Sequence, residues 1–199
     1  MKDAAGNTGL STIQKATAAI RQLAYGFAAD QVDEYVRIGE TTAIECLKRF
    51  CVAVVDIYEE RYLREPNEED VRRLLAVNTK RGFPGMLGSL DCMHWQWKNC
   101  PSGWVGQFKG KEKAPTVILE AIASYDLHIW HAFFGTPGVC NDINVLDRSP
   151  LFDRLIQGKA PQATFTINNR EYDMCYFLAD GIYPRWATLV QVSIFCHDI

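Results

Sequence analysis

The stretch that decides the fold is residues 86–98, MLGSLDCMHWQWK, an apolar run that contains a single carboxylate, Asp91. Its leucines, methionines and tryptophans are typical of a buried strand, and Asp91 comes directly after the apolar start at Met86–Leu90. A carboxylate in or beside a core costs several kcal/mol unless it is paired, hydrogen-bonded or bound to a cation. Asp91 is therefore expected to have a partner.

Three more segments follow this strand. Two short apolar runs, Thr116–Ser124 and Ile129–Phe134, are separated by turn-forming residues and predict an antiparallel meander with the first strand. The amphipathic stretch Ile143–Leu155 predicts a helix or two short ones. A last apolar run, Tyr176–Ala179, predicts a fourth strand that ends on Asp180.

The segment before the first strand has a different residue pattern. Residues 11–80 show apolar residues at helical spacing, and the paired glycines around a proline in Arg81–Gly85 mark a boundary. We expect a helical module over 1–80 and a second domain over 81–199. The module could be a helix-turn-helix with the helix after Thr42 as its reading element. The exposed side of that helix carries charges of both signs, so helical packing or partner contact remains an alternative.

Composition limits the class of protein. With 199 residues, of which 48% are apolar, the chain can bury a real core. Its seven cysteines are an odd number without CxxC pairs, which argues against a disulfide framework and for a reducing compartment. No leader and no membrane-spanning run is expected. The net charge of −3, spread over both halves, predicts weak DNA binding unless charge is concentrated locally or a partner helps.

Three aspartates are the candidates for chemistry: Asp91, Asp142 and Asp180. A meander followed by a helix and a strand is the order that a ribonuclease-H-like sheet would give, and the strands of Asp91 and Asp180 would then be neighbours. Carboxylates brought together there would repel each other and supply hard oxygen ligands for Mg²⁺ or Mn²⁺, as two-metal phosphodiester chemistry requires. The alternative is structural, with Asp142 as the N-cap of the following helix and Asp180 as a turn aspartate.

Two further groups of residues are weaker candidates for binding sites. Lys109, Lys111 and Lys113 are expected at a hairpin tip, where they could contact DNA phosphates or lie in an ordinary solvated loop. Cys92 and His94 share a strand face and could bind zinc, with further cysteines as ligands. Packing in the core is the simpler explanation for that pair.

Three ordered motifs connect these residues to a known family. They are Gly85–Trp95 with its central Asp91, Pro137–Leu146 with Asn141-Asp142, and Leu178–Pro184 with Asp180-Gly181. Together they resemble the plant transposon protein branch of the PIF/Harbinger transposases. The similarity extends from about residue 18 to about residue 190.

The resemblance implies an α/β, ribonuclease-H-like DDE nuclease domain with Mg²⁺ or Mn²⁺ as a two-metal cofactor. Asp91 and Asp180 match the first two members of the acidic triad, and Asp142 matches a further metal ligand. Members of the family are similar in cutting DNA at transposon ends and joining the freed 3′-hydroxyl to a target. They usually act with a Myb-like DNA-binding partner, and the resemblance implies a nuclear location.

The sequence departs from the family pattern at its end. Relatives continue beyond the region of Val190 to a helix that bears the last glutamate, whereas this sequence ends nine residues after Val190. The domain is therefore expected to be partial, and weak or inactive as a nuclease in this form. The alternative is a non-catalytic DNA- or protein-binding protein derived from a transposase.

Overall fold

The computed structural model describes residues 9–26, 28–151, 153 and 161–192. The chain divides into two compact units, residues 1–61 and 62–199. Helix α4 (Glu68–Lys80) belongs to the second unit, whereas the sequence grouped it with the helices before it. The reason is packing, because Leu74 of α4 lies in a buried cluster with Leu87 and Cys175 of the second unit.

The first unit is helical, as the sequence predicts. It comprises α1 (Thr12–Tyr25), the 3-10 turn η1 (Ala29–Val32), α2 (Asp33–Val36) and nearly all of α3 (Glu40–Tyr62). The side-chain amide of Gln22 donates to the carbonyls of Ala18 at 3.1 Å and Ala43 at 3.0 Å, which ties α1 to α3. The small core formed there consists of Ala18, Val32, Val36, Ile38 and Ala43.

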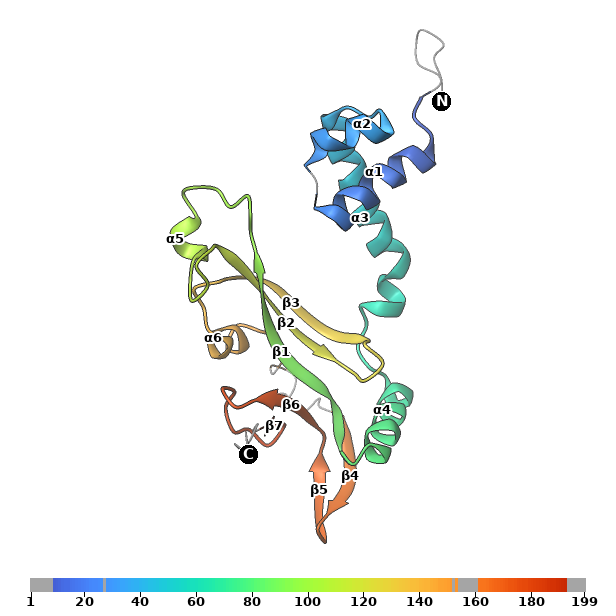
Figure 1. The fold of residues 1–199 in the computed structure, drawn as a ribbon. Helices are drawn as coiled ribbons and strands as arrows, with labels where there is room; N and C mark the ends of the chain where they lie inside the picture. Colours follow the sequence, from blue (N-terminus) through green and yellow to red (C-terminus); the bar gives the residue numbers. More distant parts are fainter. Residues whose placement is uncertain (1–8, 27, 152, 154–160, 193–199) are drawn as a thin grey trace, which may run out of the picture. The chain divides into compact units, whose positions relative to one another are not determined.

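The second unit is built on a five-stranded mixed sheet (Figure 1). Its strands are β1 (Met86–Gln96), β2 (Thr116–Ala123), β3 (Ile129–Pro137), β6 (Tyr176–Asp180) and β7 (Leu189–Val192), in the order β3-β2-β1-β6-β7. Strands β1, β2 and β3 form the antiparallel meander predicted from the sequence. Strand β6 pairs in parallel with β1, and β7 pairs in parallel with β6. The prediction that the strands carrying Asp91 and Asp180 are neighbours is confirmed.

Helix α6 (Asp142–Leu146) covers part of the sheet and spans the start of the stretch Ile143–Leu155, for which the sequence predicts one helix or two short ones. It ends before Pro150, a residue that disfavours helical backbone at the position before it. Residues 152, 154 and 155 of the predicted stretch lie outside the described residues. The main core joins α6 to the sheet and consists of Leu90, Ile122, Leu146, Ala179, Tyr183 and Leu189.

The hairpin β4 (Gln162–Ile167) and β5 (Arg170–Met174) was not expected from the sequence. Its turn residues Asn168 and Asn169 have φ angles of 49° and 60°. Two consecutive positive φ angles are typical of the type I′ turn, whose twist matches that of the paired strands, and asparagine adopts this backbone more readily than most residues. The hairpin precedes β6 directly in the chain and extends beyond the main sheet in Figure 1.

The expectations about disulfides and membrane-spanning segments can be compared with the structure for the described residues. The six cysteines that the structure describes are all free thiols. None of the described helices combines the length and the apolar character that crossing a membrane would need.

Candidate functional site

Two of the predicted acids lie on neighbouring parallel strands, Asp91 on β1 and Asp180 at the end of β6. The recorded pairing of these strands ends at Ser89 with Leu178, and each acid lies two residues beyond that pair. If the register continued, Asp91 would come opposite Asp180 and both carboxylates would lie on one side of the sheet, because side chains two apart on a strand share a face. Both acids of the triad that the resemblance implies are therefore on adjacent strands.

Both acids are exposed, so the expectation that an apolar strand buries them is wrong. The physical reason is alternation: their neighbours Leu90 and Ala179 are only 2% and 4% exposed, and the next residue on each strand points to the other face. Asp91 Oδ1 accepts the backbone N–H of Cys92, and Asp180 Oδ1 accepts that of Ile182, each at 2.8 Å. The second bond shows that Asp180 also has the turn role considered from the sequence.

Asp142 is the first residue of α6 but not its cap. The cap is Asn141, whose side-chain oxygen accepts the backbone N–H of Asn144 at 2.8 Å, while Asn144 Oδ1 accepts the N–H of Asn141 at 3.4 Å. This reciprocal capping box satisfies the helix N-terminus without the Asp142 carboxylate. The structural alternative for Asp142, an N-cap, is therefore wrong.

Electrostatics connects Asp142 to the other two acids. Partial burial raises the pKa of the Asp142 carboxyl, and repulsion from Asp180 and, more weakly, Asp91 raises it further. His94 and Lys111 act in the opposite direction, since a nearby positive charge favours the carboxylate. The three predicted acids thus form one electrostatic group contributed by β1, β6 and α6.

The three acids interact electrostatically, but the structure does not arrange them as a coordination shell. Across the described part of the chain, no group of three or more His, Cys, Asp or Glu side chains is placed so that it could hold a metal ion. The donor set nevertheless fits a hard divalent cation, because three carboxylates offer oxygen atoms only. Asp91 and Asp180 are also exposed, so an ion from solvent can reach both.

The zinc alternative finds no support among the described residues. The hydroxyl of Tyr183 donates to Cys92 Sγ at 3.2 Å, and burial raises the pKa of the Cys92 thiol to about 12. Zinc binds the thiolate, which this environment disfavours. His94 Nδ1 is engaged by Thr116 Oγ1 at 2.9 Å. Both residues therefore have structural partners, Tyr183 after β6 and Thr116 on β2.

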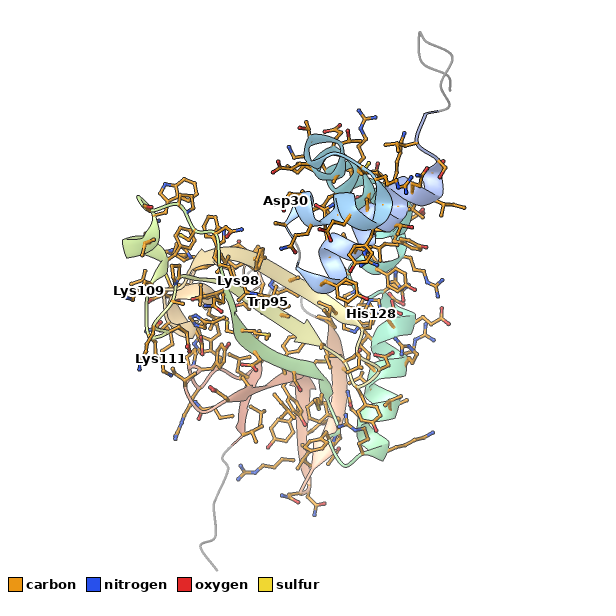
Figure 2. All side chains as sticks on the ribbon, turned by 45° about the horizontal axis from the view of Figure 1, so that its top comes forward. Asp30, Trp95, Lys98, Lys109, Lys111 and His128 are labelled. Atoms are coloured by element: carbon orange, nitrogen blue, oxygen red, sulfur yellow. The ribbon has the colours of Figure 1, made fainter. Side chains whose placement is uncertain are left out.

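The three candidate lysines lie in the connection between β1 and β2, which is longer than a hairpin tip and contains the short helix α5 (Val105–Phe108). Three aromatic rings stiffen it: Trp97 lies edge-on to Phe108 and Trp104, with ring centroids 5.0 and 5.9 Å away. All three lysines are exposed. Figure 2 shows Lys98, Lys109 and Lys111 at one end of the sheet and His128 at the other.

A close approach of two glycines places this connection beside the acids. A Cβ on Gly110 would collide with the backbone of Gly138, and a Cβ on Gly138 would collide with Thr116 Oγ1 and the carbonyl oxygen of Phe108. Only glycine fits where two backbones come this near. Gly138 lies just before α6, so the contact accounts for the effect of Lys111 on Asp142.

Sequence reasoning missed the carboxylate that is actually buried, Glu120 in the middle of β2. It is 0% exposed, and its Oε1 lies 3.0 Å from His131 Nε2, which also lies 3.1 Å from Ser149 Oγ. Its Oε2 has no hydrogen-bond partner among the described residues. The sequence does indicate this burial, because Glu120 is two residues from both Ile118 and Ile122. It therefore lies on the same apolar face of β2 as these two residues.

The sequence match agrees with this site. Residues 60–196, more than half of the chain, match the profile of a family described as plant transposon protein. The chain belongs to the plant transposon protein family. No curated protein and no solved structure matches it. The family match covers all three aspartates, the lysine-bearing connection and the second unit except for its last three residues.

Proposed function

We propose that this member of the plant transposon protein family provides a divalent-metal-dependent DNA nuclease and strand-transferase domain of the PIF/Harbinger DDE type. Asp91 and Asp180 would be the catalytic metal ligands, and Asp142 would be a further ligand. The observation that carries the proposal is the parallel pairing of β1 with β6, which puts Asp91 and Asp180 on adjacent strands, each two residues beyond the pair Ser89 and Leu178. Family membership supports action on transposon DNA.

The strand order supports a ribonuclease-H-like sheet. A three-stranded antiparallel meander is followed by α6 and then by β6, which returns to pair in parallel with β1. The first acid then lies on the central strand, the next at the start of the helix and the last at the end of the neighbouring strand. This is the arrangement expected when the acids serve one common site.

Mg²⁺ or Mn²⁺ bound here would supply activation of the attacking water or 3′-hydroxyl and stabilisation of the leaving oxygen. The chain's own contribution is to hold the Asp142 carboxylate partly buried and within the repulsion of Asp180 and Asp91, and both effects raise its pKa. That repulsion favours a cation, because binding one relieves it. Asp142 is held at the site by the Asn141 cap and by Val145 and Leu146, which are buried in the core.

DNA is the proposed substrate, and the β1–β2 connection is its proposed phosphate contact. Lys109, Lys111 and Lys113 are exposed there, and Lys111 acts electrostatically on Asp142, so a phosphate bound by Lys111 would lie near the acids. The net charge of −3 favours a further contribution to DNA binding from a Myb-like partner protein. We propose a nuclear location on the same grounds of family membership.

Metal binding tests the site directly. Calorimetric titration of the chain with Mn²⁺ should show binding, and Asp91→Asn and Asp180→Asn should each weaken it at least about tenfold, because each removes a charged ligand. Asp173→Asn is the matched control, since Asp173 is exposed on β5 in the separate hairpin. Absence of Mn²⁺ binding, or equal binding by all four proteins, would overturn the proposal.

A second experiment tests the DNA contact. Lys111→Ala should lower the affinity for a transposon-end duplex. It should also reduce the slope of log K against log salt concentration by about one unit, the loss expected for one phosphate contact. Lys80→Ala, at the exposed end of α4, removes the same charge elsewhere and should change neither quantity. The lysine role is wrong if triple replacement of Lys109, Lys111 and Lys113 by Ala leaves affinity and salt slope unchanged.

A further inference from the structure

The second half of α3 exposes apolar side chains that a helix usually buries. Val54 and Val55 are 39% and 45% exposed, and Val52 and Ile57, which lie on the two flanks beside them, are 59% and 69% exposed. The first half is different, because Ala43 and Cys46 are buried in or beside the core of the first unit. An exposed apolar stripe on a helix marks an interaction surface.

The stripe has a regular spacing. Ile44, Leu47, Cys51 and Val54 follow one another at intervals of three and four residues, and Val55 lies beside them on the same face. Such 3-4 spacing is the pattern by which two helices pack side by side. The stripe therefore fits a partner that is itself an apolar helix.

Two charges beside the stripe specify which helix fits. Lys48 and Glu59 are both exposed and are eleven residues apart, which is about three helical turns, so they lie on the same side of the stripe. In an antiparallel pair of identical helices, equivalent sides face each other and run in opposite directions. Lys48 of one copy then meets Glu59 of the other, and the same contact is repeated across the two-fold axis.

The midpoint of this pairing lies between Ala53 and Val54, within the exposed stretch. The axis therefore brings the Val54 and Val55 side chains of the two copies together at the centre, with one ion pair at each side. A parallel pair loses the contact between Lys48 and Glu59, because Lys48 would face the opposite flank of its partner, beside the apolar Phe50. Charge complementarity favours the antiparallel arrangement.

We propose that α3 is a self-association surface, on which a second copy of this chain docks its own α3 in antiparallel orientation about a two-fold axis near Val54. This is independent of the proposed nuclease function, since it uses residues of the first unit only. It gives a role to the helix whose mixed charge argued against a DNA-reading face.

Charge reversal tests the orientation as well as the contact. By sedimentation equilibrium, the chain should dimerise, and Lys48→Glu or Glu59→Lys should each raise the dimer dissociation constant about tenfold, because both symmetric ion pairs become repulsive. The double variant Lys48→Glu/Glu59→Lys restores both pairs with reversed polarity and should return the constant to near the original value. Val55→Asp should leave a folded monomer, as judged by circular dichroism.

Matched controls use the neighbouring charges on the far side of the helix. Arg49→Glu and Glu60→Lys make the same changes of charge one residue away, facing away from the stripe, and should leave the dissociation constant unchanged. A chain that is monomeric at all concentrations overturns the proposal, and loss of unfolding stability in Val55→Asp would then show that the stripe is covered within the chain. Equal effects of Lys48→Glu and Arg49→Glu would also overturn it.

Discussion

Glu120 and His131, on adjacent strands β2 and β3, form a pair in which Oε1 and Nε2 lie 3.0 Å apart and the carboxylate side chain is wholly buried. His131 Nε2 also contacts Ser149 Oγ, which follows α6, so the pair joins the sheet to the segment that carries Asp142. A buried polar group that loses its hydrogen-bond partner costs more stability than one that is removed together with that partner. The two partners should therefore differ in their mutational cost.

His131→Ala should destabilise the fold by about 3 kcal/mol, because it leaves the Glu120 carboxylate buried without a partner. Glu120→Met should cost less, since His131 keeps Ser149 and the unpaired Oε2 disappears. Urea denaturation of both variants and of Glu120→Met/His131→Phe measures the difference. The pairing has no energetic role if the three variants lose the same stability.

Asp142→Asn should stabilise the fold at neutral pH. The folded-state pKa of Asp142 is raised above its ordinary 3.8, so the unfolded chain releases the proton at lower pH than the folded one. The carboxylate thus costs stability at pH values above the raised pKa, and this cost fades as the pH falls toward 3.8. Urea midpoints of Asp142→Asn and the unchanged chain should differ at pH 7 and converge on acidification. The same substitution should weaken Mn²⁺ binding, which would show that the acid is kept for a ligand.

Much of the sheet could be predicted from the sequence because its strands have strong local signals. Residues 86–98 and the runs after Thr116 and Ile129 gave the meander, and the run ending on Asp180 gave the strand beside β1. The acids could be placed for the same reason, because strand order fixes which strand ends lie together. The family motifs added Asp142 to the candidate metal ligands, whereas its neighbouring residues alone suggest only a helix N-cap.

The exposure of Asp91, the β4–β5 hairpin and the position of Lys111 depend on tertiary contacts, which the spacing of residues in the sequence does not show. Alternation along β1 exposes Asp91 because Leu90 faces α6, and the position of α6 is set by tertiary packing. The hairpin at Asn168-Asn169 lacks the usual Asn-Gly signal, so its turn is evident only from the two positive φ angles. The proximity of Lys111 to Asp142 arises from the contact of Gly110 with Gly138, residues distant in sequence.

Asp126, in the turn between β2 and β3, should stabilise the fold in a pH-dependent way. A hydrogen bond from Ser124 and a contact with Arg73, 2.8 Å away, lower the pKa of its carboxyl from 3.8 to about 2. A lowered folded-state pKa contributes stability that is complete above 3.8 and is lost as the pH falls toward 2. Asp126→Asn should cost less than about 1 kcal/mol at pH 7, because the pair is half exposed, and nothing near pH 2. Urea unfolding at both pH values checks this, and a loss that persists at pH 2 would contradict it.

Gly138→Ala should disturb the candidate site from outside it. The added Cβ would collide with Thr116 Oγ1 and with the backbone oxygen of Phe108, and backbone cannot move aside without shifting the whole β1–β2 connection. We expect a cost of about 1–3 kcal/mol in urea unfolding, as for other overpacked positions. DNA binding should fall as well, since the shift moves Lys111 away from Asp142.

Gly106→Ala is the control for that substitution. Gly106 lies in α5 within the same connection, but a Cβ there meets nothing within 4 Å, and alanine is the better helix former. Its stability should be unchanged or slightly higher, and its DNA affinity should be unchanged. If Gly138→Ala behaves like Gly106→Ala in both measurements, the close approach of Gly110 and Gly138 does not hold the lysines at the acids. Loss of DNA affinity in Gly138→Ala without loss of stability would instead mean that the connection is displaced as a rigid piece, which its packed aromatic rings Trp97, Trp104 and Phe108 allow.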